Sequence, residues 1–461
     1  MPESRHPPDP SPAPRQDALA ATGSANGGAK GADPVVRLRA LFDAAVSSVS
    51  PAVCLRPHLA QLAARHRPGR VAVLAVGKAG ASMFAAVRDG LDRTVSGLVI
   101  TPRDPGPGDP PPDATVASVQ AGHPIPDSGS LLAGRRALAL ARSLGPGDHL
   151  LALVSGGGSA LMCAPATGVS LAGKQALTRS LLHCGAAISE INGVRKHLSR
   201  VKGGRLALAA FPATVETLAI SDIPGDDPQL IASGPTLPDP TTLAEARAVL
   251  ERYRLTPPTS ILRALGDPAN ESLKPGHPLA SGLRVTIVAR AADALAAAQA
   301  MAAQAGVQST ILGDQLEGEA RRLGAHHADL ARAMAPGDAP HLLLSGGETT
   351  VTVAHRAGRG GPNLEYLLGL VIALDGAEGI YAIACDTDGQ DGTEPVAGAV
   401  VTPSTLRRAR ELGLDARTLL SRNDSHAFFA ALGDLVVTGP TRTNVNDFRA
   451  IWIDARPSRR L

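Results

Sequence analysis

The stretch Arg70-Val-Ala-Val-Leu-Ala-Val76-Gly77-Lys78-Ala-Gly80 joins a short apolar run to a turn of small residues. A continuous apolar run of this length that ends at glycine is typical of a strand buried on both faces of a parallel sheet. In such sheets, ligands bind beyond the carboxyl ends of the strands. The stretch therefore predicts a central strand that places the ammonium group of Lys78 at a binding site.

The same pattern recurs further along the chain, where apolar runs end at polar or glycine-rich motifs and Ala-rich helical stretches separate them. The runs and the motifs that follow them are His149–Val154 with Ser155–Ser159, Val215–Ile220 with Ser221-Asp222, His341–Leu344 with Ser345–Glu348, and Tyr381–Cys385 with Asp386–Asp388. This alternation of buried strands and helices predicts an α/β fold made of doubly wound domains.

Three regions follow from the distribution of Pro, Gly and apolar residues. Residues 1–34 have no periodic apolar face, which predicts a disordered tail. Residues 255–282 carry many Pro and Gly residues without a strand or helix pattern, which marks a domain boundary. We therefore expect α/β domains at 35–270 and 271–461, with an active-site cleft between them.

The composition limits the partners of the chain. Its 461 residues carry 45 Lys and Arg against 42 Asp and Glu, and only 2% of them are aromatic, so nucleic acid is not an expected partner. The four scattered cysteines and the lack of a long apolar run predict a cytoplasmic protein without a membrane partner. A homodimer is the assembly we consider.

Two glycine-rich motifs are candidates for anion binding. Backbone N–H groups without side chains around them suit a phosphate, although a tight turn between a strand and a helix would have the same composition. One motif in each domain would clamp a polyphosphate between them. The residues expected to contact the nucleotide here are Ser155, Gly156, Gly157, Gly158, Ser159, Ser345, Gly346 and Gly347.

Basic residues at two places in the sequence are also candidates for anion binding. Lys78 would neutralise a transferring phosphoryl group or a substrate carboxylate, unless it is a solvated turn lysine. The stretch 192–205 concentrates five cations on helical spacing, so a bound anion would relieve their repulsion. We expect Arg195 and Lys196 to bind the substrate, with a solvated basic face as the alternative.

Carboxylates complete the candidate site. Asp222 would accept or orient the proton of a substrate hydroxyl, or form an Asx-turn. Asp386, Asp388 and Asp391 on one glycine-loosened loop, together with Glu348, suit Mg²⁺ held partly by phosphate oxygens. This combination of cations, carboxylates and glycine loops is what phosphoryl transfer needs.

Two well-known nucleotide-binding motifs are not supported by this sequence. The Walker-like Gly168–Lys174 is followed by Gln175 instead of a hydroxyl residue, and no predicted strand precedes it. No Gly-x-Gly-x-x-Gly follows a predicted strand, which weakens the hypothesis of a dinucleotide-dependent reductase.

The motif around Thr438–Asp447, which contains Asn446, would either cap a helix or line a nucleotide pocket.

Taken in order, the motifs resemble the glycerate 2-kinase family, whose C-terminal part is called the MOFRL domain. They are Val76–Gly80, Gly122–Asp127, Ser155–Leu161, Arg195–Ser199, Ser221–Asp226, Ser345–Glu348, Asp386–Gly389 and Thr438–Asp447, within about residues 37–454. The resemblance implies a Rossmann-like first domain and ATP-dependent phosphorylation of D-glycerate at the 2-hydroxyl, with Mg²⁺. It gives catalytic roles to Lys78 and Asp222, and nucleotide or metal contacts to Glu348, Asp386 and Asn446.

One departure from the family pattern concerns substrate binding. Where many members read Gly-Gly-Arg-Asn-Gln-Glu, this chain reads Gly360-Gly-Pro362-Asn-Leu364-Glu365, and proline has no charge to offer. Either Arg359, Arg195 or another cation takes that place, or the substrate preference differs. Members are also labelled hydroxypyruvate reductases, so reduction with NAD(P)H is the alternative function.

Overall fold

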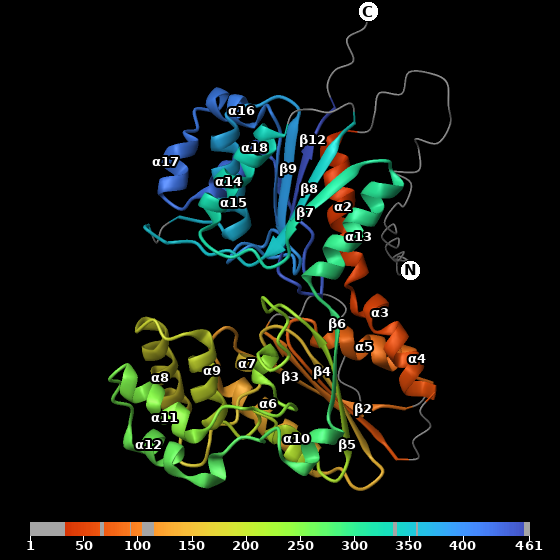
Figure 1. Ribbon diagram of the computed structural model, residues 1–461, viewed down its shortest axis with the longest axis vertical. Helices are drawn as coiled ribbons and strands as arrows, with labels where there is room; N and C mark the ends of the chain where they lie inside the picture. Colours follow the sequence, from red (N-terminus) through yellow and green to blue (C-terminus); the bar gives the residue numbers. More distant parts are fainter. Residues whose placement is uncertain are drawn as a thin grey trace, which may run out of the picture.

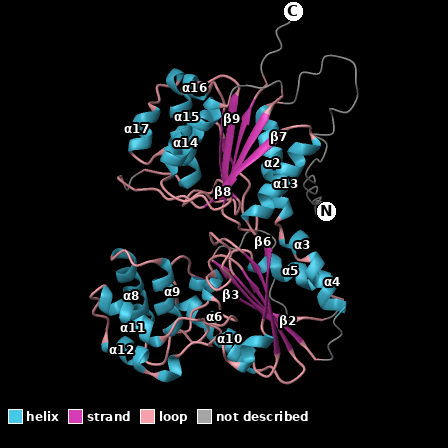
Figure 2. Ribbon diagram, viewed as in Figure 1, coloured by secondary structure: helices cyan, strands magenta, loops and turns pink. Residues whose placement is uncertain are grey.

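The computed structural model describes residues 33–64, 69–92, 94–103, 115–334, 339–355 and 358–455. Figure 1 shows two α/β bodies stacked along the long axis, and Figure 2 shows helices on both sides of each sheet. The predicted tail, residues 1–34, lies outside the described residues except at its end. There Asp33 caps a helix that begins at Pro34.

The first sheet is wholly parallel, and its strand order is β3-β2-β1-β4-β5-β6. Its strands are β1 (Val71–Val76), β2 (Ser96–Pro102), β3 (Val116–Ala121), β4 (His149–Val154), β5 (Thr214–Ile220) and β6 (Arg284–Ala289). This order is that of a dinucleotide-binding Rossmann sheet, in which ligands bind where the order reverses, between β1 and β4. The Rossmann-like first domain is confirmed.

Strand β1 is apolar throughout because both of its faces are covered. Val73 and Ala75 face a cluster that includes α5, whereas Leu74 and Val76 face the cluster under α6. The helices of this body are α3 (Pro51–Cys54), α4 (Arg56–Ala64), α5 (Gly80–Gly90), α6 (Ser128–Arg142), α7 (Gly158–Leu161), α8 (Leu171–His183), α9 (Ile188–His197), α10 (Arg205–Ala210), α11 (Leu243–Arg252) and α12 (Thr259–Gly266). Helices α8, α9, α11 and α12 share a separate apolar cluster beside the sheet.

The second sheet is mixed, in the order β11-β10-β9-β12-β8-β7. Its strands are β7 (Gln308–Gly313), β8 (His341–Gly347), β9 (Ile380–Asp386), β10 (Gly398–Val401), β11 (Leu435–Val436) and β12 (Asp447–Ile453). β12 runs antiparallel between β8 and β9, so the doubly wound prediction holds for the first sheet but is wrong for the second.

Helices cover both faces of the second sheet. One face carries α2 (Pro34–Ser48) and α13 (Ala291–Gln304). The other face carries α14 (Ala320–Ala333), α15 (Pro362–Leu374), α16 (Thr405–Glu411), α17 (Ala416–Ser421) and α18 (Ser425–Leu432). Two α/β bodies are therefore present, as predicted.

The chain divides between the bodies differently from the expected 35–270 and 271–461. Strand β6 pairs with β5, so the first sheet ends at Ala289. Helix α2 packs on the second sheet, where the Phe42 ring lies 5.8 Å from that of Phe448. The Pro- and Gly-rich stretch 255–282 folds within the first body as α12 and 3₁₀ turns. Its composition marks irregular structure and not a boundary.

A single apolar cluster continues from one body into the other. It contains Val73 of β1, Leu55 of the connection after α3 and Ile383 of β9. Among the described residues, no single helix is long and apolar enough to cross a bilayer; α2 and the following segment to Ala64 reach that length and composition only as a pair bent by 50°.

The packing of α2 on the second sheet leads to a prediction about stability. Phe42→Ala removes a fully buried ring, which costs about 3–5 kcal/mol of unfolding free energy. Trp452 of β12 is the only tryptophan of the chain, and Arg37 of α2 lies over its ring. We expect the loss of stability in the unfolding transition that the fluorescence of Trp452 reports. Urea denaturation followed by tryptophan fluorescence measures it. Phe84→Ala, buried against the first sheet, is the matched control, and an unchanged Trp452 transition in Phe42→Ala would contradict the assignment.

Candidate active site

The turns after β1 and β4 lie side by side at the switch point of the first sheet. The amide of Lys78 donates to the carbonyl of Gly156 at 2.9 Å, and the amide of Ala79 donates to Ser155 Oγ at 3.1 Å. Gly77 has φ of +129°, and a Cβ there would lie 2.1 Å from Ser155 Oγ. The glycine is therefore required for this close approach.

The loop between β4 and α7 leaves backbone donors unused. Gly157 has φ of +80°, which turns the chain away from the strand. Within the described residues, the amides of Gly156 and Gly157 donate to no acceptor, whereas that of Gly158 reaches the carbonyl of Ser155 at 3.3 Å. Two free N–H groups beyond a parallel strand suit an oxyanion.

The second body meets these turns from across the cleft. The ammonium of Lys78 lies 2.6 Å from Asp388 Oδ2, after β9. Asn446, before β12, donates its side-chain amide to the carbonyl of Asp222 at 2.8 Å. The strand ends of both bodies thus converge, as the sequence predicted.

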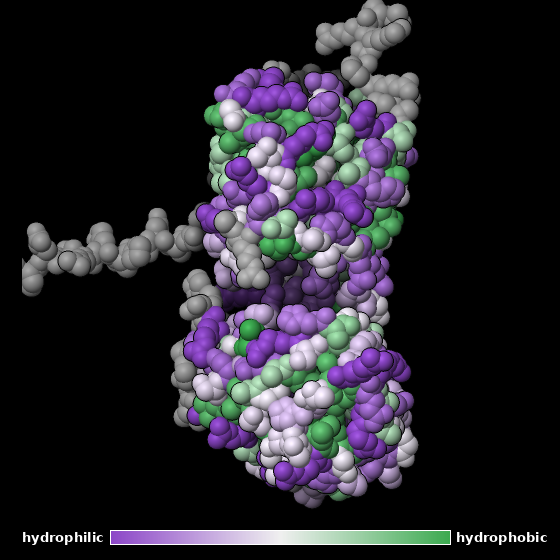
Figure 3. Space-filling model, turned by 90° about the vertical axis from the view of Figure 1, so that its left-hand side faces the viewer, coloured by the Kyte–Doolittle hydropathy of each residue, from purple (hydrophilic) through white to green (hydrophobic). Residues whose placement is uncertain are grey.

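A cavity of about 860 Å³ lies at this junction. Its lining from both bodies includes Lys78, Arg103, His123, Asp388 and Arg442. Figure 3 shows the corresponding hollow between the two halves, surrounded by hydrophilic residues. Its volume is in the range of ligand pockets.

Lys78 stays charged although it is largely enclosed. Burial lowers its pKa, but the carboxylates of Asp388, Asp386 and Asp222 outweigh burial, so the pKa is raised above its usual value. His123, by contrast, has a lowered pKa because of burial and the charge of Lys78. The nearby acids therefore keep Lys78 in its charged form.

The carboxyl of Asp222 lies against the loop after β4. Burial raises the pKa of its carboxyl to about 6, against the lowering effect of Lys78. Asn444 donates to its Oδ2 at 3.4 Å. A Cβ on Gly156 would lie 1.9 Å from the same oxygen, so the absence of a side chain there lets the carboxylate rest on the loop.

The remaining acids of the cleft offer oxygen ligands. Burial and the charges of Asp388 and Asp447 raise the pKa of Asp386 well above its usual value. Glu348 is exposed to solvent, yet the protein around it and the charges of Asp222 and Asp447 raise its pKa to about 7. Hard oxygen ligands that repel one another fit a divalent cation such as Mg²⁺. In the part of the chain described, no three His, Cys, Asp or Glu side chains converge enough to hold a metal alone.

Residues 37–266 match the family described as a domain of unknown function, DUF4147, and residues 341–447 match the MOFRL family. The chain is 39% identical over 383 residues to the D-glycerate 2-kinase of Thermotoga maritima, covering 82% of this chain and 89% of that protein. The chain belongs to the glycerate 2-kinase family.

Two further relatives cover most of the chain. The crystal structure of the glycerate kinase of Thermotoga maritima has a TM-score of 0.82 and 36% identity, covering 91% of this chain and 99% of that one. A protein of Agrobacterium vitis, named provisionally as a hydroxypyruvate reductase, is 49% identical over 423 residues, covering 90% of this chain and 94% of that protein.

The second glycine-rich motif, Ser345–Glu348, was predicted to form an open loop but lies mostly within a strand. Ser345, Gly346 and Gly347 are the buried last residues of β8 and pair with β12. A Cβ on Gly347 would lie 2.2 Å from the amide of Leu316, so these glycines admit a crossing segment. The expectation of an open anion loop is wrong there, and of this motif only Glu348 is exposed.

Asp391 also differs from its predicted role as a metal ligand. Its carboxylate accepts hydrogen bonds from the backbone amides of Asn363 and Leu364, both at 2.9 Å. It therefore caps the start of α15, whose first residue is Pro362. Proline suits that first position because its missing N–H needs no partner.

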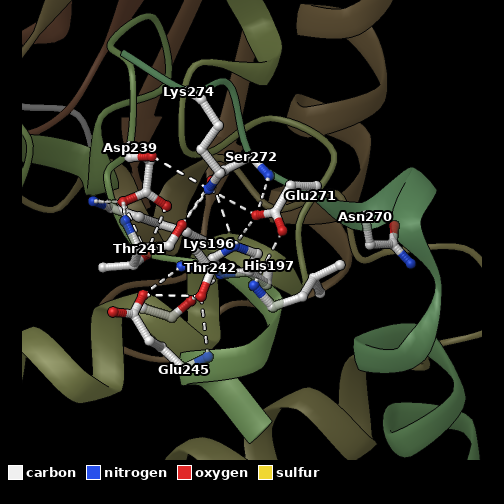
Figure 4. A network of polar contacts seen from close by, with 12 residues as sticks. Lys196, His197, Asp239, Thr241, Thr242, Glu245, Asn270, Glu271, Ser272 and Lys274 are labelled. Carbon is white, nitrogen blue, oxygen red and sulfur yellow. Dashed lines mark hydrogen bonds and ion pairs between the residues drawn. The ribbon is translucent and has the colours of Figure 1, made fainter. Parts of the chain in front are cut away.

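Lys196 is structural rather than substrate-binding. It is buried and pairs at 3.2 Å with Asp239, whose carboxylate also accepts from Thr241 (Figure 4). Neighbouring Arg195 is half-buried, and its side chain bonds only to Asn192 Oδ1, at 3.4 Å, among the described residues. The basic stretch thus splits into a structural lysine and a cation without a carboxylate partner.

The sequence missed two arginines of the cavity, Arg103 and Arg442. Arg359, a candidate replacement for the family arginine, pairs instead with Glu394. Arg442 lines the cavity, has φ of +65°, and its carbonyl accepts from Ser82 Oγ at 2.7 Å. Its place inside the motif Thr441-Arg-Thr443 was the available signal.

The structural role of Lys196 can be measured. Lys196→Met leaves the Asp239 carboxylate, which is fully buried, without its cation, so we expect a loss of about 3–5 kcal/mol of unfolding free energy. Chemical denaturation gives the value. The double variant Lys196→Met/Asp239→Asn should recover part of the loss, whereas an unchanged stability of the single variant would return Lys196 to the candidate substrate ligands.

Proposed function

We propose that this protein is an ATP-dependent glycerate 2-kinase that converts D-glycerate and ATP into 2-phosphoglycerate and ADP. The observation that carries the proposal is the meeting of Lys78 and Asp388 across the cavity between the two bodies, with the charge of Asp222 acting on the same lysine. A cation, a carboxylate of raised pKa and acids that repel one another are the parts that phosphoryl transfer uses. The Thermotoga maritima relative, a D-glycerate 2-kinase, supports this reaction.

Asp222 accepts the proton of the 2-hydroxyl as its oxygen attacks the γ-phosphorus. The new bond joins that oxygen to phosphorus, and the bond from phosphorus to the β-phosphate oxygen breaks, with its electron pair leaving on ADP. At neutral pH, a carboxyl with a pKa of about 6 is mostly ionised and still basic enough for this transfer.

Lys78 stabilises the charge that develops on the moving phosphoryl group. Its ammonium is exposed enough to meet a ligand, since 32% of the side chain is accessible. The free amides of Gly156 and Gly157 bind phosphate oxygens at the end of β4. Ser155 and Ser159 support this loop, because Ser155 Oγ accepts from Ala79 and Ser159 Oγ bonds to Ser233 Oγ.

Mg²⁺, held by Asp386, Asp388 and Glu348 with phosphate oxygens, would supply charge neutralisation for ATP. Arg195 binds the carboxylate of glycerate, because its guanidinium has no acidic partner among the described residues. Asn446 acts by fixing Asp222 through the backbone. The cytoplasmic location and the homodimer remain predictions.

One coupled experiment tests the reaction against its rival. With ATP, Mg²⁺ and D-glycerate, we expect ADP release from the purified protein, and with NADH and hydroxypyruvate but no ATP we expect no oxidation of NADH. Lys78→Ala should lower kcat by about 10²–10³-fold without loss of the fold, because the moving charge loses its cation. Oxidation of NADH without ADP release would favour the reductase named for the Agrobacterium vitis relative.

The pH profile tests the role of Asp222. The carboxylate must be ionised to accept a proton, so kcat/KM for glycerate should fall about tenfold per pH unit below its pKa of about 6. The charged groups facing it are Lys78, Asp388 and Glu348. Glu348→Gln removes the group whose pKa is about 7, so a limb near pH 6 that persists in this variant belongs to Asp222. Asp222→Asn should lose that limb and about 10²–10⁴-fold in rate.

A further inference from the structure

Three cations gather behind the loop that follows β4. Lys174 of α8 is 7% exposed and Lys202, after α9, is fully buried, while Arg195 at the end of α9 is half-buried. The charges of Arg195 and Lys174 both act on Lys202. These residues, Lys174, Arg195 and Lys202, are the cation cluster.

No carboxylate balances the cation cluster. Lys174 Nζ donates to the carbonyls of Leu198 at 2.9 Å and of Arg195 at 3.5 Å. Lys202 Nζ donates to the carbonyl of Ser159 at 2.8 Å. Over the described ranges, none of the three cations forms an ion pair with a carboxylate, and their hydrogen bonds go to neutral carbonyl and amide oxygens. The Cys163 thiol is the acidic group that acts on all three.

Nearby lysines show that this fold supplies acids where a lysine is purely structural. Lys196, the residue after Arg195, pairs with Asp239 at 3.2 Å, and Lys274 pairs with Glu271 at 2.7 Å (Figure 4). Buried charges without such partners are costly and rare in proteins. In the cation cluster, burial and mutual repulsion lower the pKa of Lys202 well below its usual value, and burial lowers that of Lys174 to about 8.

The position of the cation cluster links it to the cleft. Ser159, whose carbonyl accepts from Lys202, closes the loop that begins at Ser155 and carries the free amides of Gly156 and Gly157. The same loop touches Asp222 at Gly156. An anion that reaches the cation cluster therefore contacts the segment that supports the proposed base.

We propose that Lys174, Arg195 and Lys202 form a binding site for a small oxyanion, either the carboxylate of the acceptor substrate or a phosphate group. The inference deepens the proposed function, on which it rests for the identity of the carboxylate. An oxyanion would supply the negative charge that the chain itself withholds and would accept charge-assisted hydrogen bonds from several directions. Lys174 and Lys202 are then part of the site, in addition to Arg195.

The competing explanation is that the two lysines only cap carbonyls. Lys174 reaches the last carbonyls of α9, where a cation is favourable, and Lys202 holds the loop through Ser159. The two explanations differ in the effect of removing a charge while keeping the shape. Capping predicts a less stable protein with unchanged anion affinity, and an anion site predicts the reverse.

The test uses Lys202→Met in the full-length protein without ATP. Calorimetry measures the Kd of D-glycerate and, separately, of inorganic phosphate, and thermal unfolding is followed with and without each anion. In the wild type we expect binding of at least one of them and a rise in Tm. In Lys202→Met we expect at least a tenfold higher Kd and loss of the Tm rise, with an unliganded Tm no lower than that of the wild type.

Lys196→Met is the matched control, since it removes a buried lysine one residue from Arg195. It should lower the unliganded Tm while leaving the Kd of both anions within about twofold. The anion whose affinity falls in Lys202→Met identifies the source: glycerate for a carboxylate site, phosphate for a phosphate site. Unchanged Kd values in Lys202→Met, or a wild type that binds neither anion, would overturn the proposal. Binding of glycerate without any ADP release would contradict the kinase and leave the site standing.

Discussion

The ion pair between Lys78 and Asp388 joins two sheets that share no hydrogen bonds between strands. It requires the turn after β1 to point its lysine out of the first sheet, which Gly77 permits by lying against Ser155. It also requires the loop after β9 to present Asp388, whose neighbour Asp386 accepts its amide at 2.9 Å. Because Asp386 and Asp222 act on the same ammonium, the charge of Lys78 organises acids from both bodies.

The cleft can exist because the two bodies are held together elsewhere. The apolar cluster through Leu55 and the packing of α2 on the second sheet connect them beside the cleft, and Thr443 Oγ1 donates to the carbonyl of Val49 at 2.7 Å in that region. Burial of apolar surface is not directional and tolerates small movements, whereas the polar contacts of the cleft are directional. This division leaves the polar face available for ligands.

The sequence predicted the elements that depend on local pattern, namely the buried strands and the motifs at their ends. It could not place β12, because an antiparallel strand between β8 and β9 has the same apolar composition as a parallel one. Likewise Lys196 and Arg195 have equal sequence signals, and only Asp239, 43 residues away, separates their roles. Asp391 resembles a metal ligand in sequence, yet it caps a helix that begins 29 residues earlier, at Pro362. Partners distant in sequence decided each of these outcomes.

Charge is distributed unevenly around the loop after β4, and this would orient the two substrates in the proposed site. On the side of the second body, Asp386, Asp388 and Glu348 act on Lys78, and Arg103 and Arg442 line the same cavity. Behind the loop, the cation cluster has no carboxylate partner among the described residues. A polyphosphate needs a divalent cation to approach the first side, whereas a free carboxylate is attracted to the second. An acceptor with its carboxylate toward the cation cluster would turn its hydroxyl toward Asp222, which touches the loop at Gly156. In the proposed reaction, this asymmetry would oppose exchange of the two substrates, and it comes from side chains that both bodies contribute.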